Sequence, residues 1–511
     1  SQQGETTMDF RNLLGTIDRR RLRLLELLYE RRSGCSTEYL LDSLNCSLPV
    51  LLKDQKALNE AQSDFFIEKK WGLYYLKSAD QATLSELYSF FLNYTTEFKI
   101  LEELLYERCE NISQLAATLF VSPSHAQRCL RKLDRILRVT QMKLYHRPLR
   151  IGGHEGAVRH MYYRYFTEKY HEIEITLPQG SAGQKETFEH FVNEFIEVNE
   201  YHPTYIFKHR LVYNMYISAW RIKNGHFFPE EELTSSYPKA PNQQSCEALA
   251  KALLRDYQIV WRKEVFKELM WLQFSDALIF NEAHRSQALR ENKRVCQQFN
   301  HHMETVRQLN QLFSEPVSQK VLEKLATTMM NSSYLYPEDG KYIQILRRNE
   351  RDLVLAFLAV YEQSVSKILD LLHRQATRYK LYDEEGFRYI FTYWTLTLIP
   401  DSMERLQKAS PQINILVVSS LTPTEEKFIT YLINTGVYGN FSIDTISVTA
   451  ESVYEISGKY DLIISTGKLN RISPNVAFIA IDPVLDGQSM TRIQKKISEL
   501  AMRKKADSEC E

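Results

Sequence analysis

Glycine and cysteine are both scarce in this chain, which has 17 glycines and seven cysteines among 511 residues. Nucleotide-binding and hydrolytic enzymes depend on particular loops, and the sequence contains no G-x-x-x-x-G-K-S/T loop, no G-x-S-x-G turn and no H-E-x-x-H helix. The cysteines are odd in number and none are spaced C-x-x-C, so they predict neither a zinc site nor a disulfide framework. We therefore expect no enzymatic activity, no cofactor and no metal.

The chain also lacks a net charge and long apolar runs. It has 64 basic and 64 acidic residues, and no run of about 18 apolar residues that could span a bilayer. Its start does not show the basic and then apolar order of a secretory signal, so we expect a soluble, cytoplasmic protein without a membrane partner. Residues 1–7, ahead of Met8, are interpreted as the remnant of a cleaved tag. The length and the 44% hydrophobic content suffice for roughly three to five packed domains.

A strong helix-turn-helix signal lies at residues 112–137. Two short helices joined by a tight turn are predicted there, with Ser113 as a cap of the first helix and Phe120 filling the turn. The second helix begins at Ser122, a good N-cap, and Pro123 follows at a position where a missing N–H costs nothing. Because DNA-reading proteins place such a second helix in the major groove, this helix is the candidate reader.

The second helix has two distinct faces. Six apolar residues follow helical spacing and form a stripe expected to be buried: Ala126, Cys129, Leu130, Leu133, Ile136 and Leu137. The opposite face carries side chains that can contact base edges and phosphates: Ser122, Ser124, His125, Gln127, Arg128, Arg131, Lys132 and Arg135. A charged helix face is ordinarily only solvated. Residues 121–160, however, hold nine basic and two acidic residues, a net charge of +7 in a neutral chain, and that clustering favours DNA.

The same pattern occurs earlier in the chain. The sequence LLYER at 27–31 recurs at 104–108, and each copy precedes a serine-led short helix and a second serine-led helix. Ser36 aligns with Ser113, and the first copy carries a two-residue insertion. Residues 19–62 are therefore predicted to form a first helix-turn-helix unit, with Lys53 and Lys56 facing outward as further DNA contacts.

Residues 65–76, directly after this unit, alternate and turn like a β-hairpin. A hairpin in this place is typical of a winged helix-turn-helix, and Lys69 and Lys70 at its tip would face phosphate. The pattern is equally consistent with a hairpin that only covers the hydrophobic core of the first unit.

The rest of the chain has a helical part followed by a part in which strands and helices alternate. Residues 157–405 are helical almost throughout and predict two helical bundles of about 120 residues each. From residue 414 strands alternate with helices, which predicts a small parallel α/β sheet with its ligand-binding loop at residues 419–423. The predicted fold class is therefore mainly α and multidomain, with tandem helix-turn-helix units, two helical bundles and a small C-terminal α/β domain.

These features together support a family resemblance. The phrases LAxxLxVSxS at 115–124 and IGGxExxVR at 151–159 resemble the Mga-type regulators of Gram-positive bacteria, which include the RofA-like proteins and AtxA. The phrase AWRIK at 219–223 looks most like the RofA-like branch. The resemblance covers residues 8–505 and implies five domains. These are a first winged helix-turn-helix at 8–80, a second helix-turn-helix at 81–160, phosphotransferase-regulation domains at 161–285 and 286–407, and an EIIB-like α/β domain at 410–505.

The resemblance also implies how such a protein works. Members of the family bind double-stranded promoter DNA of surface and virulence genes, commonly dimerise through the EIIB-like domain, and have histidines that can take phosphate from a phosphotransferase-system phosphocarrier. His209 is the best-placed candidate, and the further candidates are His284, His301 and His302. In each case a satisfied or surface histidine is the simpler interpretation.

The C-terminal domain departs from an active EIIB component, which carries a phosphorylated cysteine in its first strand-to-helix loop. Here that loop has Ser419, Ser420 and Thr422, and a serine without an activating base cannot replace a thiolate. The resemblance therefore implies a docking or dimerising domain.

Two hypotheses follow. The favoured one is a homodimeric DNA-binding transcription regulator whose second helix-turn-helix supplies the main groove contacts. The alternative is a phosphorelay or docking adaptor without sequence-specific DNA binding. The missing loop cysteine and the net charge of +7 both favour the regulator.

Overall fold

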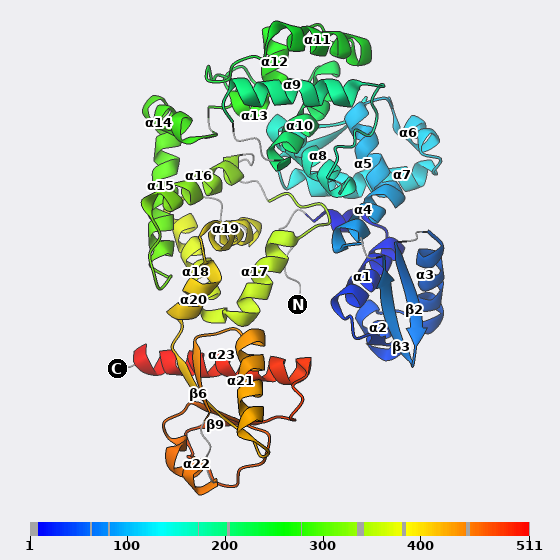
Figure 1. Ribbon diagram of the computed structural model, residues 1–511. Helices are drawn as coiled ribbons and strands as arrows, with labels where there is room; N and C mark the ends of the chain where they lie inside the picture. Colours follow the sequence, from blue (N-terminus) through cyan, green and yellow to red (C-terminus); the bar gives the residue numbers. More distant parts are fainter. Residues whose placement is uncertain are drawn as a thin grey trace. The chain divides into compact units, whose positions relative to one another are not determined.

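The computed structural model describes residues 9–61, 64–79, 82–171, 173–201, 205–276, 278–334, 342–380, 385–445 and 450–509. The interpretation of residues 1–7 as a tag remnant lies outside these residues. The chain divides into two compact units, Ser1–Cys296 with Asn331–Arg348, and Gln297–Met330 with Asn349–Glu511. The predicted fold class, mainly α and multidomain with a helix-turn-helix domain, is confirmed (Figure 1).

The first helix-turn-helix consists of three helices and a hairpin. After the short 3-10 helix η1 (Phe10–Leu13) come α1 (Thr16–Glu30), α2 (Thr37–Leu44), α3 (Leu48–Ala61) and the antiparallel strands β2 (Phe65–Lys70) and β3 (Leu73–Ser78), with β1 (Cys35–Ser36) paired to β3. The hairpin turns at Trp71 and Gly72, both of which have positive φ. The hairpin predicted from the alternating pattern is therefore present, and Figure 1 shows it beside α1 and α3.

The second helix-turn-helix has the same plan. Its elements are α4 (Leu84–Tyr94), α5 (Thr96–Tyr106), α6 (Ile112–Thr118), α7 (Pro123–Arg138), the strands β4 (Met142–His146) and β5 (Leu149–Gly153), and α8 (Glu155–Lys169). The hairpin β4–β5 was not predicted from the sequence. Its signal is a short alternation, since Met142 and Leu144 are buried while Lys143 between them is exposed.

Two details of the predicted turn are wrong. The cap of α6 is Asn111, whose side chain accepts the N–H of Gln114 at 3.0 Å, and not Ser113. Ser36, which caps α2 by accepting the N–H of Tyr39, therefore corresponds to Asn111, and the two-residue insertion precedes the first capped helix. Phe120 does not fill the turn, because its left-handed backbone (φ 55°) turns the side chain outward and leaves it 95% exposed.

The middle of the chain is helical, as predicted. Its helices are α9 (Gln184–Val198), α10 (Tyr205–Lys223), α11 (Gln243–Tyr257), α12 (Lys263–Leu269), α13 (Trp271–Phe274), α14 (Glu282–Glu291), α15 (Lys293–Asn310), α16 (Gln319–Tyr334), α17 (Asn349–Val360), α18 (Glu362–Tyr379), α19 (Glu385–Leu398) and α20 (Ser402–Ala409). Helices α17 and α18 are separate because Tyr361 between them leaves the helical conformation and buries its ring.

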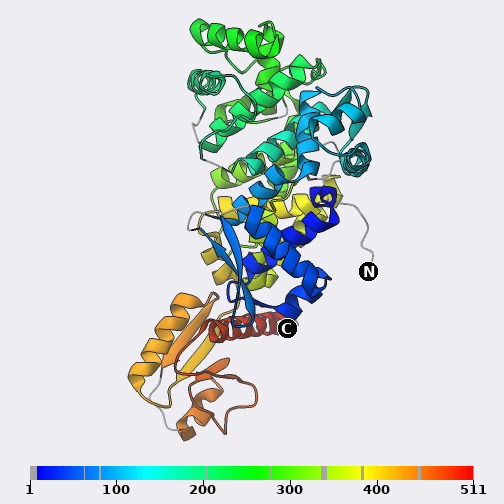
Figure 2. The same cartoon turned by 90° about the vertical axis from the view of Figure 1, so that its right-hand side faces the viewer.

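The C-terminal domain is the predicted parallel α/β sheet. Its strands are β6 (Ile413–Val418), β7 (Phe441–Thr445), β8 (Leu462–Ser465) and β9 (Ala477–Ala480), all parallel in the order β7-β6-β8-β9. The helices α21 (Pro423–Gly436) and α23 (Gly487–Glu509) pack on one face of β6, and α22 (Ala450–Ser457) packs on the other. Figure 2 shows α21 in orange and α23 in red beside this sheet.

No helix among the described residues combines the length and the apolar character that a bilayer crossing requires.

Candidate nucleic-acid interface

Helix α7 has the two faces that the sequence predicts. Ser122 caps it by accepting the backbone N–H of His125 at 3.2 Å, and Pro123 occupies the first helical position. All six residues of the predicted apolar stripe are buried. Since the buried stripe fixes the rotation of the helix, the polar residues must face away from the core.

The outward face is cationic and largely without partners in the chain. The exposed members of the predicted set are Ser122, Ser124, Gln127, Arg128, Arg131 and Arg135, whereas His125 and Lys132 are half-buried. Lys132 donates to the carbonyl of Leu14 at 3.4 Å. Among the described residues, no acidic group lies within ion-pair distance of Arg128, Arg131 or Arg135. These three guanidinium groups are therefore available to an external anion.

The net charge of residues 121–160 lies at the protein surface. Arg159 and Glu155 are buried and paired with each other at 2.9 Å, so both drop out of the surface charge. The segment then has eight basic residues and one acidic residue, Asp134, so its net charge is still +7. Asp134 is itself paired with Arg138 at 2.8 Å, and its other oxygen accepts the N–H of Leu144, which ties α7 to the second hairpin.

The second hairpin adds cations that sequence reasoning did not assign to DNA. Lys143, His146 and Arg147 are exposed near its turn. The ring of Tyr145 lies between Lys143 and Arg150, with the charged groups 5.3 and 4.5 Å from its centroid. The cations in residues 138–150 of the +7 segment were the available signal, but without the hairpin they could not be placed.

The first unit is less suited to reading bases. Lys53 and Lys56 are exposed on α3 as predicted, and Lys56 lies 3.8 Å from Glu60. Asp54 of α3 is buried between Leu51 and Leu58 on the same helix, where it is an ion-pair partner, 2.6 Å from Arg20 and 3.0 Å from Arg21 of α1. The acid therefore has a structural role in joining α3 to α1.

The first hairpin covers the hydrophobic core of its unit and also has two lysines beside its turn. Phe65, Ile67 and Tyr74 are buried, so one face of the hairpin covers the core. Lys69 and Lys70 are exposed beside the turn, where Lys69 donates to the hydroxyl of Thr37 at 3.2 Å and Lys70 pairs with Glu68 at 3.2 Å. Their charges thus lie near the tip, but each already has a partner in the chain.

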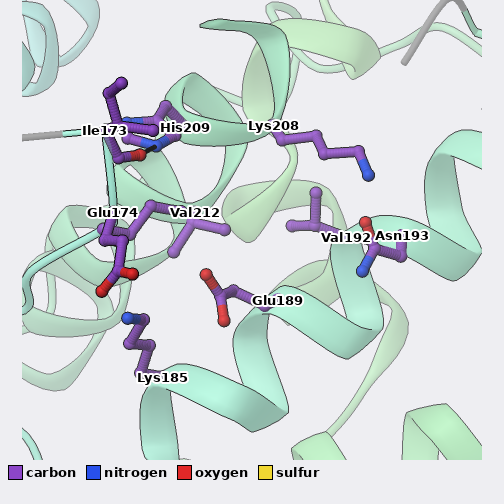
Figure 3. A pocket seen from close by; sticks show the side chains of 10 residues that line it. Ile173, Glu174, Lys185, Glu189, Val192, Asn193, Lys208, His209 and Val212 are labelled. Atoms are coloured by element: carbon purple, nitrogen blue, oxygen red, sulfur yellow. Dashed lines mark hydrogen bonds between the residues drawn. The ribbon is translucent and has the colours of Figure 1, made fainter. Parts of the chain in front are cut away.

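His209 lies beside a cavity of about 490 Å³, which Figure 3 shows between α9 and α10. Lys185 and Lys208 contribute cations to the lining, and Glu174 and Glu189 contribute acids. The Nε2 atom of His209 is 2.7 Å from the carbonyl oxygen of Ile173, and burial lowers the pKa of this imidazole. Of the four candidate phosphoacceptors, His209 is the one whose surroundings have both space and cations.

Two of the other three histidines are more deeply buried than His209. His284 is 4% exposed and its Nδ1 accepts the N–H of Phe280. The ring of His301 stacks on Tyr379 at 4.1 Å. His302 is 4% exposed against the ring of Phe391, and burial, with a smaller contribution from His301, lowers the pKa of His302 to about 4. His284 lines a smaller cavity of about 170 Å³ whose charged lining residues are the acids Asp276 and Glu291. A phosphocarrier would have to reach His302 through packed side chains.

The depressed pKa of His302 makes the stability of its domain depend on pH. The unfolded chain binds a proton near pH 6.5, whereas the folded protein binds it only near pH 4. Stability is therefore lost as the pH falls from about 6.5 to 4. We expect wild type to lose about 2–3 kcal/mol more than His302→Gln between pH 7.5 and 4.5. Urea unfolding at both pH values measures this difference, and equal losses in the two proteins would contradict it.

The loop at the carboxyl end of β6 has hydroxyl groups and acids. Ser419 donates to Glu425, Ser420 and Thr466 share a hydrogen bond of 3.1 Å, and Thr422 caps α21. Glu425 and Glu426 occupy the first turn of α21, where their charge opposes an incoming phosphate. The geometry thus agrees with the sequence in disfavouring phosphate transfer here.

Comparison with known proteins gives a consistent result. A family model described as the Mga helix-turn-helix domain matches residues 80–166, which include α7 and the second hairpin. The chain is 21% identical over 463 residues, 89% of its length and 92% of the relative, to a protein of Streptococcus pneumoniae serotype 4 described as a trans-acting regulator. It is also 27% identical to the capsule synthesis positive regulator AcpA of Bacillus anthracis over 209 residues, which cover 40% of this chain and 43% of AcpA. With a helix-turn-helix domain that matches the Mga model and with relatives named as regulators, the chain is a DNA-binding transcription regulator that is similar to Mga-type proteins.

Proposed function

We propose that this regulator reads promoter DNA with α7 in the major groove. Ser124, Gln127, Arg128 and Arg131 contact base edges or the adjacent backbone, and Lys132 and Arg135 contact phosphates. The observation that carries the proposal is the exposed face of α7, which lies opposite a fully buried apolar stripe. Three arginines on this face have no acidic partner within the part of the chain that the structure describes. Gathering unpaired cations on one helix is unfavourable unless an anion such as the DNA backbone neutralises them.

The two hairpins act as wings that contact phosphates beside the groove. Lys143 and Arg147 of the second hairpin are exposed and close to α7 in sequence and in fold. Lys69 and Lys70 of the first hairpin, with Lys53 and Lys56 of α3, provide weaker and less specific contacts, since three of these four lysines already have partners. His125 contributes least to DNA, because its Nε2 lies 3.5 Å from the sulfur of Cys129.

The remaining domains transmit signals and assemble the regulator. Residues 161–285 and 286–407 are the two phosphotransferase-regulation domains, and phosphorylation of His209 by a phosphotransferase-system phosphocarrier modulates activity. Residues 410–505 are the EIIB-like domain, through which two chains dimerise. The dimer contact is supported by three large apolar side chains on or beside α21 that are each more than half exposed: Leu421, Phe428 and Tyr431. The targets are promoters of surface or virulence genes, a class to which the capsule genes regulated by AcpA belong.

Two single variants separate base reading from phosphate contact. Gln127→Ala is expected to lower the preference for a promoter duplex over a scrambled duplex about fivefold or more, because its amide can pair with a base edge. Arg147→Ala is expected to lower the affinity for both duplexes by the same factor, because a wing arginine neutralises phosphate. Fluorescence anisotropy with the full chain measures both affinities. If Gln127→Ala prefers the promoter duplex over the scrambled duplex as strongly as wild type does, Gln127 does not contact a base.

A further inference from the structure

Three side chains of metal-ligating type meet behind the cationic face of α7. Glu97 lies in the first turn of α5, and His125 and Cys129 are one helical turn apart on α7. Each contributes one possible ligand atom, and these atoms all lie within 4.8 Å of one another. This cluster could not be predicted from the sequence, because Glu97 is distant in the chain and the two α7 residues match no metal motif.

The distance between sulfur and nitrogen fits a shared ion. Cys129 Sγ is 3.5 Å from His125 Nε2. Typical bonds of about 2.3 Å from zinc to sulfur and about 2.0 Å from zinc to nitrogen, at a tetrahedral angle, place the two atoms about 3.5 Å apart. A thiol that donates a hydrogen bond to the imidazole would account for this distance equally well. The pair alone therefore does not settle what the cluster does.

The carboxylate of Glu97 favours an ion. Glu97 is only 5% exposed, and its side chain accepts one backbone N–H, that of Gly15 at 3.1 Å. Within the described part of the chain, no lysine or arginine lies within ion-pair distance of it. Lys132, one turn after Cys129, donates to the carbonyl of Leu14 instead. A buried carboxylate without a cationic partner is costly, and a metal ion between the three side chains would neutralise it.

The surroundings also suit metal binding. The N–H of Gly15 holds the carboxylate in place, as hydrogen bonds from outside the ligand set commonly do in metal sites. His125 is half-buried beside the exposed Ser122 and Ser124, so an ion can reach the cluster from solvent. Cys129 is buried by contrast, which places the thiol on the protein side of the site.

We propose that Glu97, His125 and Cys129 bind one divalent transition-metal ion, with Zn²⁺ the best match to a mixed set of sulfur, nitrogen and oxygen ligands. The thiol proton of Cys129 passes to solvent when the sulfur binds the metal, and water completes the coordination. The ion then joins α5 to α7 and fixes the orientation of the reading helix. The metal site stands independently of the proposed DNA contacts.

Titration of the metal-free full chain with Co²⁺ tests the site. We expect one Co²⁺ per chain, with absorption bands typical of thiolate ligation and tetrahedral geometry. Cys129→Ser should lose the thiolate band, and Cys129→Ser, His125→Ala and Glu97→Gln should each bind about 100-fold more weakly or worse. Cys109→Ser is the matched control, because Cys109 is also buried but hydrogen-bonds to Thr118. It should bind as wild type does.

Binding without a thiolate band, or an unchanged spectrum in Cys129→Ser, would overturn the proposal. Circular dichroism of each variant establishes that it is folded. Glu97→Gln, which keeps the size of the side chain, allows a second readout. Zn²⁺ should raise the thermal midpoint of wild type and leave that of Glu97→Gln unchanged, and an equal rise in both proteins would also overturn the proposal.

Discussion

Replacing Glu155 with glutamine is expected to lower the free energy of unfolding by about 3–5 kcal/mol. Glu155 is buried at the start of α8 between two buried arginines. One carboxylate oxygen accepts N–H groups from Arg159 and Arg221, both at 2.9 Å, and the other accepts from Arg221 at 2.7 Å. A glutamine amide would turn a donor toward one guanidinium group and leave both positive charges without their shared counterion.

The ion pairs around Glu155 join several elements of the first unit. Arg159 also donates to the side chain of Glu268 in α12 at 2.6 Å, and Arg221 donates to the carbonyl of Ile151 in β5 at 2.9 Å. Burial alone would raise the pKa of Glu155, but the guanidinium groups of Arg221 and Arg159 outweigh it and lower this pKa to about 2. The carboxylate is therefore charged at neutral pH, as the prediction requires.

Urea unfolding followed by tryptophan fluorescence measures the effect of Glu155→Gln, because Trp220 precedes Arg221 and Trp271 closely follows Glu268. The matched control is Glu60→Gln, which removes an exposed pair with Lys56 and should change stability by less than about 1 kcal/mol. If both variants shift the unfolding midpoint by the same small amount, the network around Glu155 does not stabilise this unit.

The second large effect concerns DNA. The double variant Arg128→Ala, Arg131→Ala is expected to bind a promoter duplex about 2–6 kcal/mol more weakly, roughly 30-fold or more, since each arginine contact is worth about 1–3 kcal/mol. Both side chains are exposed and have no ion-pair partner among the described residues, so the fold should not change. Anisotropy measures the affinity, and circular dichroism checks the fold.

Two controls locate the effect on α7. Arg138→Ala removes a cation from the same helix, but one that is already paired with Asp134, and should weaken binding far less. Lys53→Ala, Lys56→Ala removes two cations from α3 and should also have the smaller effect. If the α3 variant loses more affinity than the α7 variant, the first unit is the principal DNA reader and the assignment must be exchanged.

The reading helix could be predicted in detail because its information is local. Helical spacing of six apolar residues fixed the buried face of α7, and Ser122 with Pro123 fixed its start. The order of strands and helices in the C-terminal domain was likewise predicted, because continuous apolar runs such as Ile413–Val418 are typical of buried parallel strands. In both cases neighbouring residues alone determine the element.

What the sequence did not reveal depends on partners distant in the chain. The phrases IGGxExxVR and AWRIK supported the family resemblance without a physical reason. The structure supplies one, since Glu155, Arg159 and Arg221 from these phrases form the buried ion pairs. The cluster of Glu97, His125 and Cys129 was missed for the same reason, because its members come from two helices. The burial of Asp54 likewise depends on Arg20 and Arg21, which lie on another helix.

The most direct test of the central claim is the salt dependence of DNA binding by wild type and by Arg128→Ala, Arg131→Ala. A plot of the logarithm of affinity against the logarithm of salt concentration has a slope of about −0.9 for each phosphate that the protein neutralises. We predict steep salt dependence for wild type, and for the variant a lower affinity with a slope shallower by roughly one for each arginine that contacts phosphate. Equal affinity and equal slope in the two proteins would contradict the conclusion that α7 binds DNA.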